Sequence, residues 1–336
     1  MKKKYIAAAG AAILMPLLLI RSEDAARGVY DGLLLCGGTL IPALFPFMAA
    51  AEIFASCVPC KTRSGAVLLT FILSFAGGYP AGARCTSKFF SRGLLDRRQA
   101  SMLFLSCFNT GPAFAVTAVG IMMRDSLKEG LLLWGINAVS CIITALGVWT
   151  IYGRIGPQLS CAVRSGEESR PAAVSALSSA LTGIMTVCGF TLLFTCLLQI
   201  LAGFFGKGFL YTVAAALLEV TNGCLALSSR GSLCIVSACI GLGGLCVWAQ
   251  NMSFAKEFGI SFRAYAAARI FQAAVSFTLA LPFSSPLFTD VFSGEDALTA
   301  EFTSAGASAS VGIFLLTAVI AGLVYKICSP KRKAEN

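Results

Sequence analysis

The sequence contains no histidine, and only 12% of its 336 residues are charged. Without histidine the chain lacks the commonest general base and the commonest nitrogen ligand for metals. It also has no phosphate-binding loop, and its few acidic residues in apolar segments are too far apart in sequence to suggest a catalytic pair. These absences argue against an enzyme. We therefore predict no catalytic residue, no metal site and no cofactor.

Apolar residues are abundant instead, at 57% of the chain, with a mean hydropathy of +0.80. A soluble fold of this length would lack the polar surface to cover them. A membrane helix needs about 20 mainly apolar residues. Windows of this kind lie at 6–20, 33–54, 131–151, 180–204, 264–281 and 311–324, and shorter or interrupted ones at 67–79, 102–123, 211–227 and 233–248. The sequence predicts an all-α polytopic membrane protein with about eight to ten membrane segments, some of which do not cross fully.

The net charge of +10 comes from short basic runs beside apolar segments, which is typical of membrane topology rather than of nucleic-acid binding. Basic residues at 2–4 and at 326–333 predict that both termini are cytoplasmic and that the number of crossings is even. The acidic stretch 284–310 is predicted to be external and the basic stretch 84–98 cytoplasmic. The first apolar run is interpreted as an uncleaved helix rather than a signal peptide.

Fourteen cysteines are scattered through the apolar segments. In such surroundings cysteine usually acts as a small packing residue, so we predict no disulfide framework. The spacing of Cys57 and Cys60 is that of a redox pair, but a thioredoxin-like context and a second pair for zinc are missing from the sequence.

A polar linker at 156–175 divides the chain into two halves with similar patterns. We expect a transmembrane helix and short loop at 1–27, a first repeat at 28–155, a second repeat at 176–283, and an external loop, last helix and basic tail at 284–336. Each half has two apolar segments interrupted by glycine and polar residues, at 75–83 and 106–113 and at 218–224 and 241–251. Interruptions at matching places favour a transporter with a site near the bilayer midplane. Inverted and parallel repeats both fit the pattern.

An interrupted helix in lipid must be buried in protein or line a polar cavity, because its backbone groups need partners. The N-termini of half-helices attract anions. The alternative is that the glycines and prolines kink packed helices while the amides and hydroxyls hold them together. The residues predicted to surround a substrate are Gly77, Gly78, Tyr79, Pro80, Asn109, Thr110, Glu219, Thr221, Asn222, Gln250 and Asn251.

Glu219 stands out because a carboxylate within an apolar segment is costly and usually functional. It is predicted to couple a proton or cation, or to bind substrate while protonated; alternatively it caps a half-helix or pairs with arginine. Glu52 is expected near a helix end at the interface. Arg84 could draw an anion toward the cavity or simply mark the cytoplasmic side.

Two motifs in the first half, Phe75-Ala-Gly-Gly-Tyr-Pro-Ala-Gly-Ala-Arg84 and Cys107-Phe-Asn-Thr-Gly-Pro-Ala-Phe114, resemble the YlbJ-type sporulation integral membrane proteins. The second half is similar at Leu218-Glu-Val-Thr-Asn-Gly223 and Gly243-Gly-Leu-Cys-Val-Trp-Ala-Gln250. The chain departs from the family pattern at Gly77, where serine is usual, and at Gly111, ahead of the proline. The resemblance implies a gate-domain fold related to nucleoside transporters and transport of dipicolinic acid across the outer forespore membrane.

These observations favour a carrier or channel for a small anionic solute, in a multi-pass cell membrane protein, with a proton or sodium as the coupling ion. An assembly of identical chains is compatible with the sequence. The alternatives are a scaffold in spore envelope assembly, in which the interruptions would pack dry and Glu219 would be replaceable, and a transporter of another solute such as a nucleoside. A membrane-embedded enzyme would need converging acids and is the least favoured.

Overall fold

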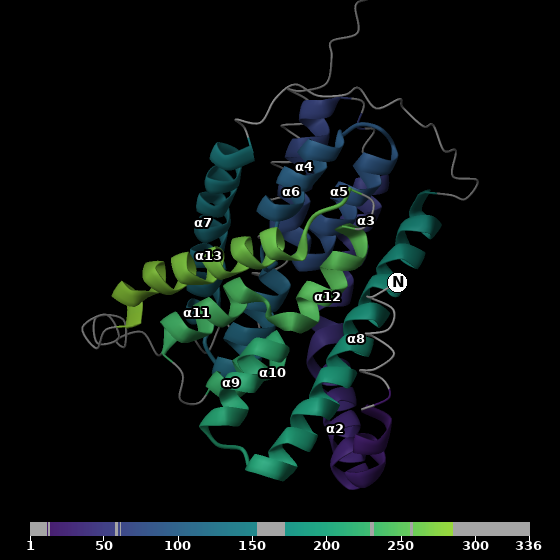
Figure 1. The fold of residues 1–336 in the computed structure, drawn as a ribbon. Coiled ribbons are helices and arrows are strands. Elements are labelled where there is room, and N and C mark those ends of the chain that lie inside the picture. Colours follow the sequence, from purple (N-terminus) through teal and green to yellow (C-terminus); the bar gives the residue numbers. More distant parts are fainter. Residues whose placement is uncertain are drawn as a thin grey trace, which may run out of the picture.

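The computed structural model describes residues 12, 14–57, 60, 62–152, 172–228, 232–255 and 258–284, and within these residues it contains helices and no strand (Figure 1). Five of the described helical stretches are long and apolar enough to cross a membrane: Ser22–Ser56, Leu127–Thr150, Val174–Phe205, Leu233–Phe254 and Phe262–Ser284. These helices confirm the predicted fold class, an all-α membrane protein. Both termini, the predicted helix at 311–324, most of the linker, and residues 6–11 and 13 of the first apolar run lie outside the described residues.

A long N-terminal helical stretch consists of α2 (Ser22–Leu35), the π-helix η1 (Cys36–Leu40) and α3 (Ile41–Cys57), and it packs along α8 (Ala172–Phe205) (Figure 1). Glycines on α2 allow the close approach. A Cβ atom on Gly28 would lie 2.7 Å from Cα of Cys196, and one on Gly32 would lie 3.3 Å from Cα of Leu192. Glycines four residues apart commonly let membrane helices pack backbone to backbone. Helix α8 begins at Ala172, within the predicted linker.

Helices α4 (Arg63–Gly77) and α5 (Tyr79–Ser91) form a hairpin whose tip is Gly78. The chain folds back sharply there, since a Cβ atom on Gly82 would lie 2.9 Å from the Cβ atom of Ser74. The φ and ψ angles of Gly78 are 77° and −164°, a region that is essentially restricted to glycine. The glycine is therefore what permits the tip.

A second hairpin consists of α9 (Phe209–Leu218) and α10 (Val220–Ser228), with Glu219 in an extended conformation at its tip. A Cβ atom on Gly223 would lie 2.6 Å from Cα of Ala216, so this hairpin is also tight. In Figure 1, α9 and α10 lie at the opposite end of the molecule from α4 and α5. The two hairpins thus extend into the protein from opposite ends.

Two further helical segments are interrupted. Helix α6 (Arg97–Ser106) is followed by irregular chain at 107–111 and then by the π-helix η2 (Ala113–Met123). Helix α11 (Leu233–Leu242) is separated from α12 (Gly244–Phe254) by a turn at Gly243, where φ is positive at Gly243 and at Gly244. All four predicted interruptions are therefore present. Gln250 and Asn251, however, lie inside α12 rather than at its interruption.

Helices α7 (Leu127–Tyr152) and α13 (Phe262–Ala280) complete the described core, and the short 3-10 helix η4 (Leu281–Ser284) ends it; α13 runs across α7 in Figure 1. Buried polar groups join α7, α11 and α13. Ser276 Oγ lies 3.2 Å from Asn137 Oδ1 and 2.8 Å from Ser140 Oγ, and Asn137 Nδ2 donates to Ser237 Oγ at 3.3 Å. Such hydrogen bonds hold membrane helices together where the hydrophobic effect cannot.

The cysteines whose side chains are described are free thiols, and all but Cys60 are buried, in keeping with the predicted packing role. The side chain of Cys57, which has the spacing of a redox pair with Cys60, is not among the described side chains.

Candidate functional site

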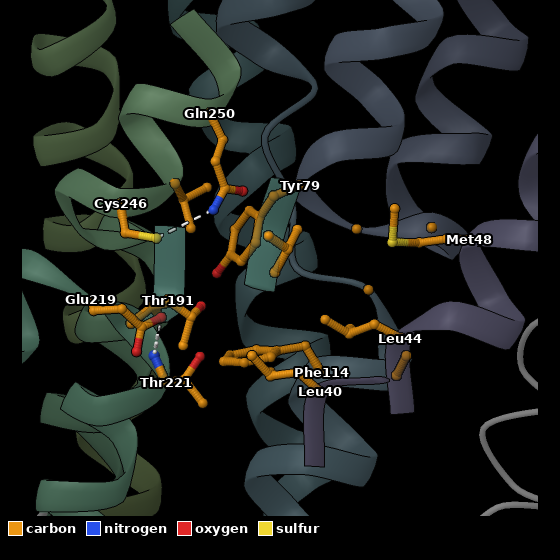
Figure 2. Close-up of a pocket in the computed structure, with 17 residues that line it drawn as sticks. Leu40, Leu44, Met48, Tyr79, Phe114, Thr191, Glu219, Thr221, Cys246 and Gln250 are labelled. Atoms are coloured by element: carbon orange, nitrogen blue, oxygen red, sulfur yellow. Dashed lines mark hydrogen bonds between the residues drawn. The ribbon is translucent and has the colours of Figure 1, made fainter. Parts of the chain in front are cut away.

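A cavity of about 40 Å³ lies between the tips of the two hairpins (Figure 2). It is large enough for a few water molecules. Leu40, Leu44 and Met48 supply an apolar wall, and Glu219, Thr191 and Thr221 form a polar group on the other side. The lining residues are Leu40, Leu44, Met48, Gly77, Gly78, Tyr79, Gly111, Ala113, Phe114, Val187, Thr191, Glu219, Val220, Thr221, Cys246, Val247 and Gln250.

Glu219 is 1% exposed, and its carboxylate caps the N-terminus of α10. Oε1 accepts a hydrogen bond from the backbone N–H of Thr221 at 3.1 Å, and Oε2 accepts from the N–H of Asn222 at 2.7 Å and from its Nδ2 at 2.9 Å. Of the two alternatives to a transport role, capping is thus present. Pairing with arginine is not, because no cation among the described residues forms an ion pair with Glu219.

Because Glu219 caps α10, the N-terminus of this helix does not serve as the predicted anion-binding position. The N-terminus of α10 is occupied by the protein's own carboxylate, so it is not open to an anionic ligand while Glu219 is ionised. The N-termini of α5 and α12 have no side-chain cap, because Gly78 and Gly243 occupy their capping positions.

Tyr79 connects the first hairpin to the second half of the chain. Its hydroxyl donates to the carbonyl oxygen of Ile240 at 2.5 Å. Its ring lies 4.6 Å from that of Phe108 and 6.3 Å from that of Phe114, measured between centroids. A buried tyrosine with its hydroxyl bonded has a single defined orientation, so Tyr79 is a fixed wall of the cavity.

Each hairpin tip is crossed by the other interrupted segment of its own half. Gly78 lies against Gly111 in the first half, and a Cβ atom on either would lie 2.9 Å from the amide nitrogen of the other. In the second half, a Cβ atom on Gly244 would lie 3.1 Å from the amide nitrogen of Val220 and 3.3 Å from that of Glu219. Backbone thus meets backbone at both crossings, which is possible because the residues there are glycines.

Arg269 of α13 is completely buried near this site. Its Nη2 donates to the carbonyl oxygen of Leu105 at 2.6 Å, and its Nη1 donates to the carbonyl oxygen of Phe108 at 3.2 Å and to Gln272 Oε1 at 2.5 Å. Gln272 Nε2 donates to the same Phe108 oxygen at 2.9 Å. The guanidinium carbon lies 3.9 Å from the centre of the Phe108 ring. Arg269 therefore binds the carbonyl end of α6, where a cation is favourable.

Four of the remaining predicted site residues, Asn109, Thr110, Asn222 and Asn251, are buried and are not among the residues that line the cavity. Asn222 binds Glu219 and donates from Nδ2 to Thr195 Oγ1 at 2.7 Å. Asn251 Nδ2 donates to the hydroxyl of Tyr265 at 3.2 Å. Asn109 and Thr110 are buried in the irregular chain after α6. Pro80 lies in the first turn of α5, and its side chain is outside the described part.

Arg84 and Glu52 interact with each other. Arg84 Nε lies 3.4 Å from Glu52 Oε1, and Arg84 Nη2 donates to the carbonyl oxygen of Ser179 at 2.7 Å. Gly183 leaves room for the guanidinium, because a Cβ atom there would overlap it. The pair joins α3, α5 and α8 and is less than one-fifth exposed.

Sequence reasoning missed Thr191, Arg269 and Gln272. A signal was present for each, since a polar side chain in the apolar windows 180–204 and 264–281 is costly in lipid. Arg269 was the clearest, since it is the one charged residue in the apolar window 264–281. Within the part of the chain that the structure describes, no group of three or more histidine, cysteine or acidic residues is suited to a metal ion.

Comparisons with protein-family models, with curated proteins and with solved structures gave no match. The resemblance to the YlbJ-type proteins therefore stays a prediction from the motifs.

Proposed function

We propose that this protein transports a small anionic solute across a membrane through the cavity between the two hairpin tips. The observation that carries the proposal is a buried carboxylate without a cationic partner, Glu219, beside a cavity in a chain with five apolar helices long enough to cross a bilayer. A charged side chain in this position is costly and is typical of ion and substrate pathways.

The arrangement of the two halves supports the proposal. In each half a hairpin tip contacts the second interruption, at Gly78 with Gly111 and at Glu219 with Gly244. The hairpins enter from opposite ends of the molecule (Figure 1). We infer that the halves are inverted repeats, with α4–α5 equivalent to α9–α10 and α6–η2 equivalent to α11–α12. A site between discontinuous helices of inverted repeats is a recurrent design of secondary transporters.

The size of the cavity bears on the mechanism. A volume of about 40 Å³ is far below the several hundred cubic ångströms of typical ligand pockets. A solute of the size of a pyridine dicarboxylate therefore requires movement of at least one hairpin. We propose that the described conformation is an occluded one.

Dipicolinate is the first solute to test, because the family resemblance implies it and because Tyr79 and Phe114 offer aromatic faces to a planar ring. The experiment is uptake of labelled dipicolinate into proteoliposomes that contain the purified chain, compared with empty vesicles. Glu219→Gln is the test variant. Glu23→Gln, at an exposed position of α2, is the matched control.

Saturable uptake that is retained in Glu23→Gln and altered in Glu219→Gln would support transport through this cavity. Absence of uptake of dipicolinate and of other small carboxylates by folded protein, under proton and sodium gradients, would overturn the proposal and favour a scaffold role.

A further inference from the structure

We propose, on the basis of the function proposed above, that Arg269 is a fixed positive charge that makes the cavity selective for anions, and that an anion is bound together with a proton on Glu219. The geometry points to this pairing because the cavity has one charged group at its wall and one directly behind it.

Arg269 lies behind the aromatic wall of the cavity. Its guanidinium is 3.9 Å from the centre of the Phe108 ring, and that ring is 4.6 Å from the ring of Tyr79, which lines the cavity. The charge is thus no more than about 8.5 Å from the Tyr79 ring, a range over which a unit charge still acts strongly when water is excluded.

The charge of Arg269 is not neutralised by a partner in the described part of the chain. Its hydrogen bonds go to carbonyl oxygens and to a side-chain amide, and no carboxylate there forms an ion pair with it. Arginine remains protonated in proteins. The interior beside the cavity therefore carries a permanent positive charge.

None of the described groups around Glu219 is a cation that forms an ion pair with its carboxylate. Those that interact with it electrostatically are thiols, namely Cys36 of η1, Cys224 of α10 and Cys246 of α12. Thr191 of α8 and Tyr79 of α5 line the same cavity. A buried thiol and a tyrosine are uncharged near neutral pH. Arg124 also acts on Cys224, and it forms an ion pair with Glu129. Glu219 and Arg269 are thus the charged groups beside the cavity that have no ion-pair partner among the described residues.

These two charges give the cavity two electrostatic states. With Glu219 ionised, an entering anion would contact a like charge in surroundings of low dielectric constant, which is strongly unfavourable. With Glu219 protonated, the charge of Arg269 is uncompensated, and an anion is attracted. Anion binding and protonation of Glu219 must then favour each other, since linkage is reciprocal. The expected result is co-transport of an anion and a proton.

The test uses the full chain in proteoliposomes with an entrapped pH indicator. Labelled pyridine-2,6-dicarboxylate is the probe, and the neutral pyridine-2,6-dicarboxamide is the competitor. The variants are Glu219→Gln, Arg269→Lys, Arg269→Gln and Gln272→Leu. The last removes the hydrogen bonds of Gln272 to the Phe108 oxygen and to Arg269 without changing charge, so it reports the structural role of this network.

We expect uptake of the dicarboxylate by the unaltered protein to acidify the vesicle interior, and uptake by Glu219→Gln to proceed without acidification. Arg269→Gln should raise the KM for the dicarboxylate at least about tenfold, while inhibition by the dicarboxamide changes little. Arg269→Lys and Gln272→Leu should keep the preference for the anion.

Uptake by the unaltered protein without acidification would overturn the inference and leave the proposed function standing. The inference would also be overturned, with the proposed function still standing, if Arg269→Gln and the unaltered protein preferred the dicarboxylate over the dicarboxamide to the same extent. If Arg269→Gln does not fold, the comparison of acidification between the unaltered protein and Glu219→Gln decides alone. Failure of the unaltered protein to take up either compound would overturn both proposals.

Discussion

The backbones of Gly78 and Gly111 are in direct contact, such that a Cβ atom on either residue would lie 2.9 Å from the amide nitrogen of the other. We predict that Gly78→Ala destabilises the protein, because its φ of 77° and ψ of −164° cost a non-glycine residue about 1–3 kcal/mol even before the contact with Gly111 is counted. Thermal unfolding in detergent measures the effect.

The matched control is Gly189→Ala. Gly189 lies within α8 with nothing near its Cβ position, so alanine there should be neutral or slightly stabilising. Equal melting temperatures for the two variants would show that the tip of the first hairpin does not depend on Gly78.

Tyr79→Phe should lower the free energy of unfolding by about 1–3 kcal/mol, because the carbonyl oxygen of Ile240 loses its buried donor. Tyr30→Phe, at an exposed site of α2, is expected to have little effect. Chemical unfolding of both variants in detergent tests the difference, and a loss of stability in Tyr30→Phe as large as in Tyr79→Phe would contradict it.

Replacements of Glu219 should separate its capping role from its charge. Glu219→Ala removes the cap of α10 and should cost about 0.5–2 kcal/mol, whereas Glu219→Gln keeps an acceptor oxygen and should lie closer to the unaltered protein. Both should alter uptake of solute. If Glu219→Ala is as stable and as active as the unaltered protein, neither role of this residue stands.

The Glu52–Arg84 pair should show coupling in a double-mutant cycle. Glu52→Leu and Arg84→Met each leave one charge with reduced compensation and should cost about 1–3 kcal/mol, between the values for exposed and fully buried pairs. The double variant should be more stable than the sum of the single changes predicts. Strict additivity in unfolding measurements would be inconsistent with a direct interaction.

Asn109 provides a test that isolates function from stability. Its side chain is completely buried, and neither of its polar atoms has a hydrogen-bond partner within the described structure. Such a group is costly to bury, so Asn109→Ala should leave stability unchanged or increase it. We expect transport to fall nonetheless. Asn137→Ala, which breaks bonds to Ser237 and Ser276, should reduce stability instead.

The interruptions could be predicted from sequence because glycine and proline act locally. Gly78, Gly243 and Gly244 adopt positive φ angles that other residues avoid, and the irregular chain at 107–111 leads into Pro112. Likewise Glu219 could be identified because a carboxylate between Leu218 and Val220 has no ordinary place in a membrane segment.

The composition of the site was harder to predict because it depends on which helices meet. Arg269 follows Phe108 by 161 residues, and only the packing of α13 against the end of α6 brings them together. Asn109 does not line the cavity, although Gly111 and Phe114 of the same segment do. The spacing of apolar residues along a helix does not show which distant segment the helix contacts.

The opposite entry of the two hairpins has a consequence for how the cavity can be opened. The tips of both hairpins line the cavity, with Gly77, Gly78 and Tyr79 from the first and Glu219, Val220 and Thr221 from the second. On the transport function proposed above, withdrawal of one tip would open the cavity on its side while the other tip stayed in place. In a transporter built in this way, a cross-link that holds one hairpin in place would leave only the other hairpin free to open the cavity.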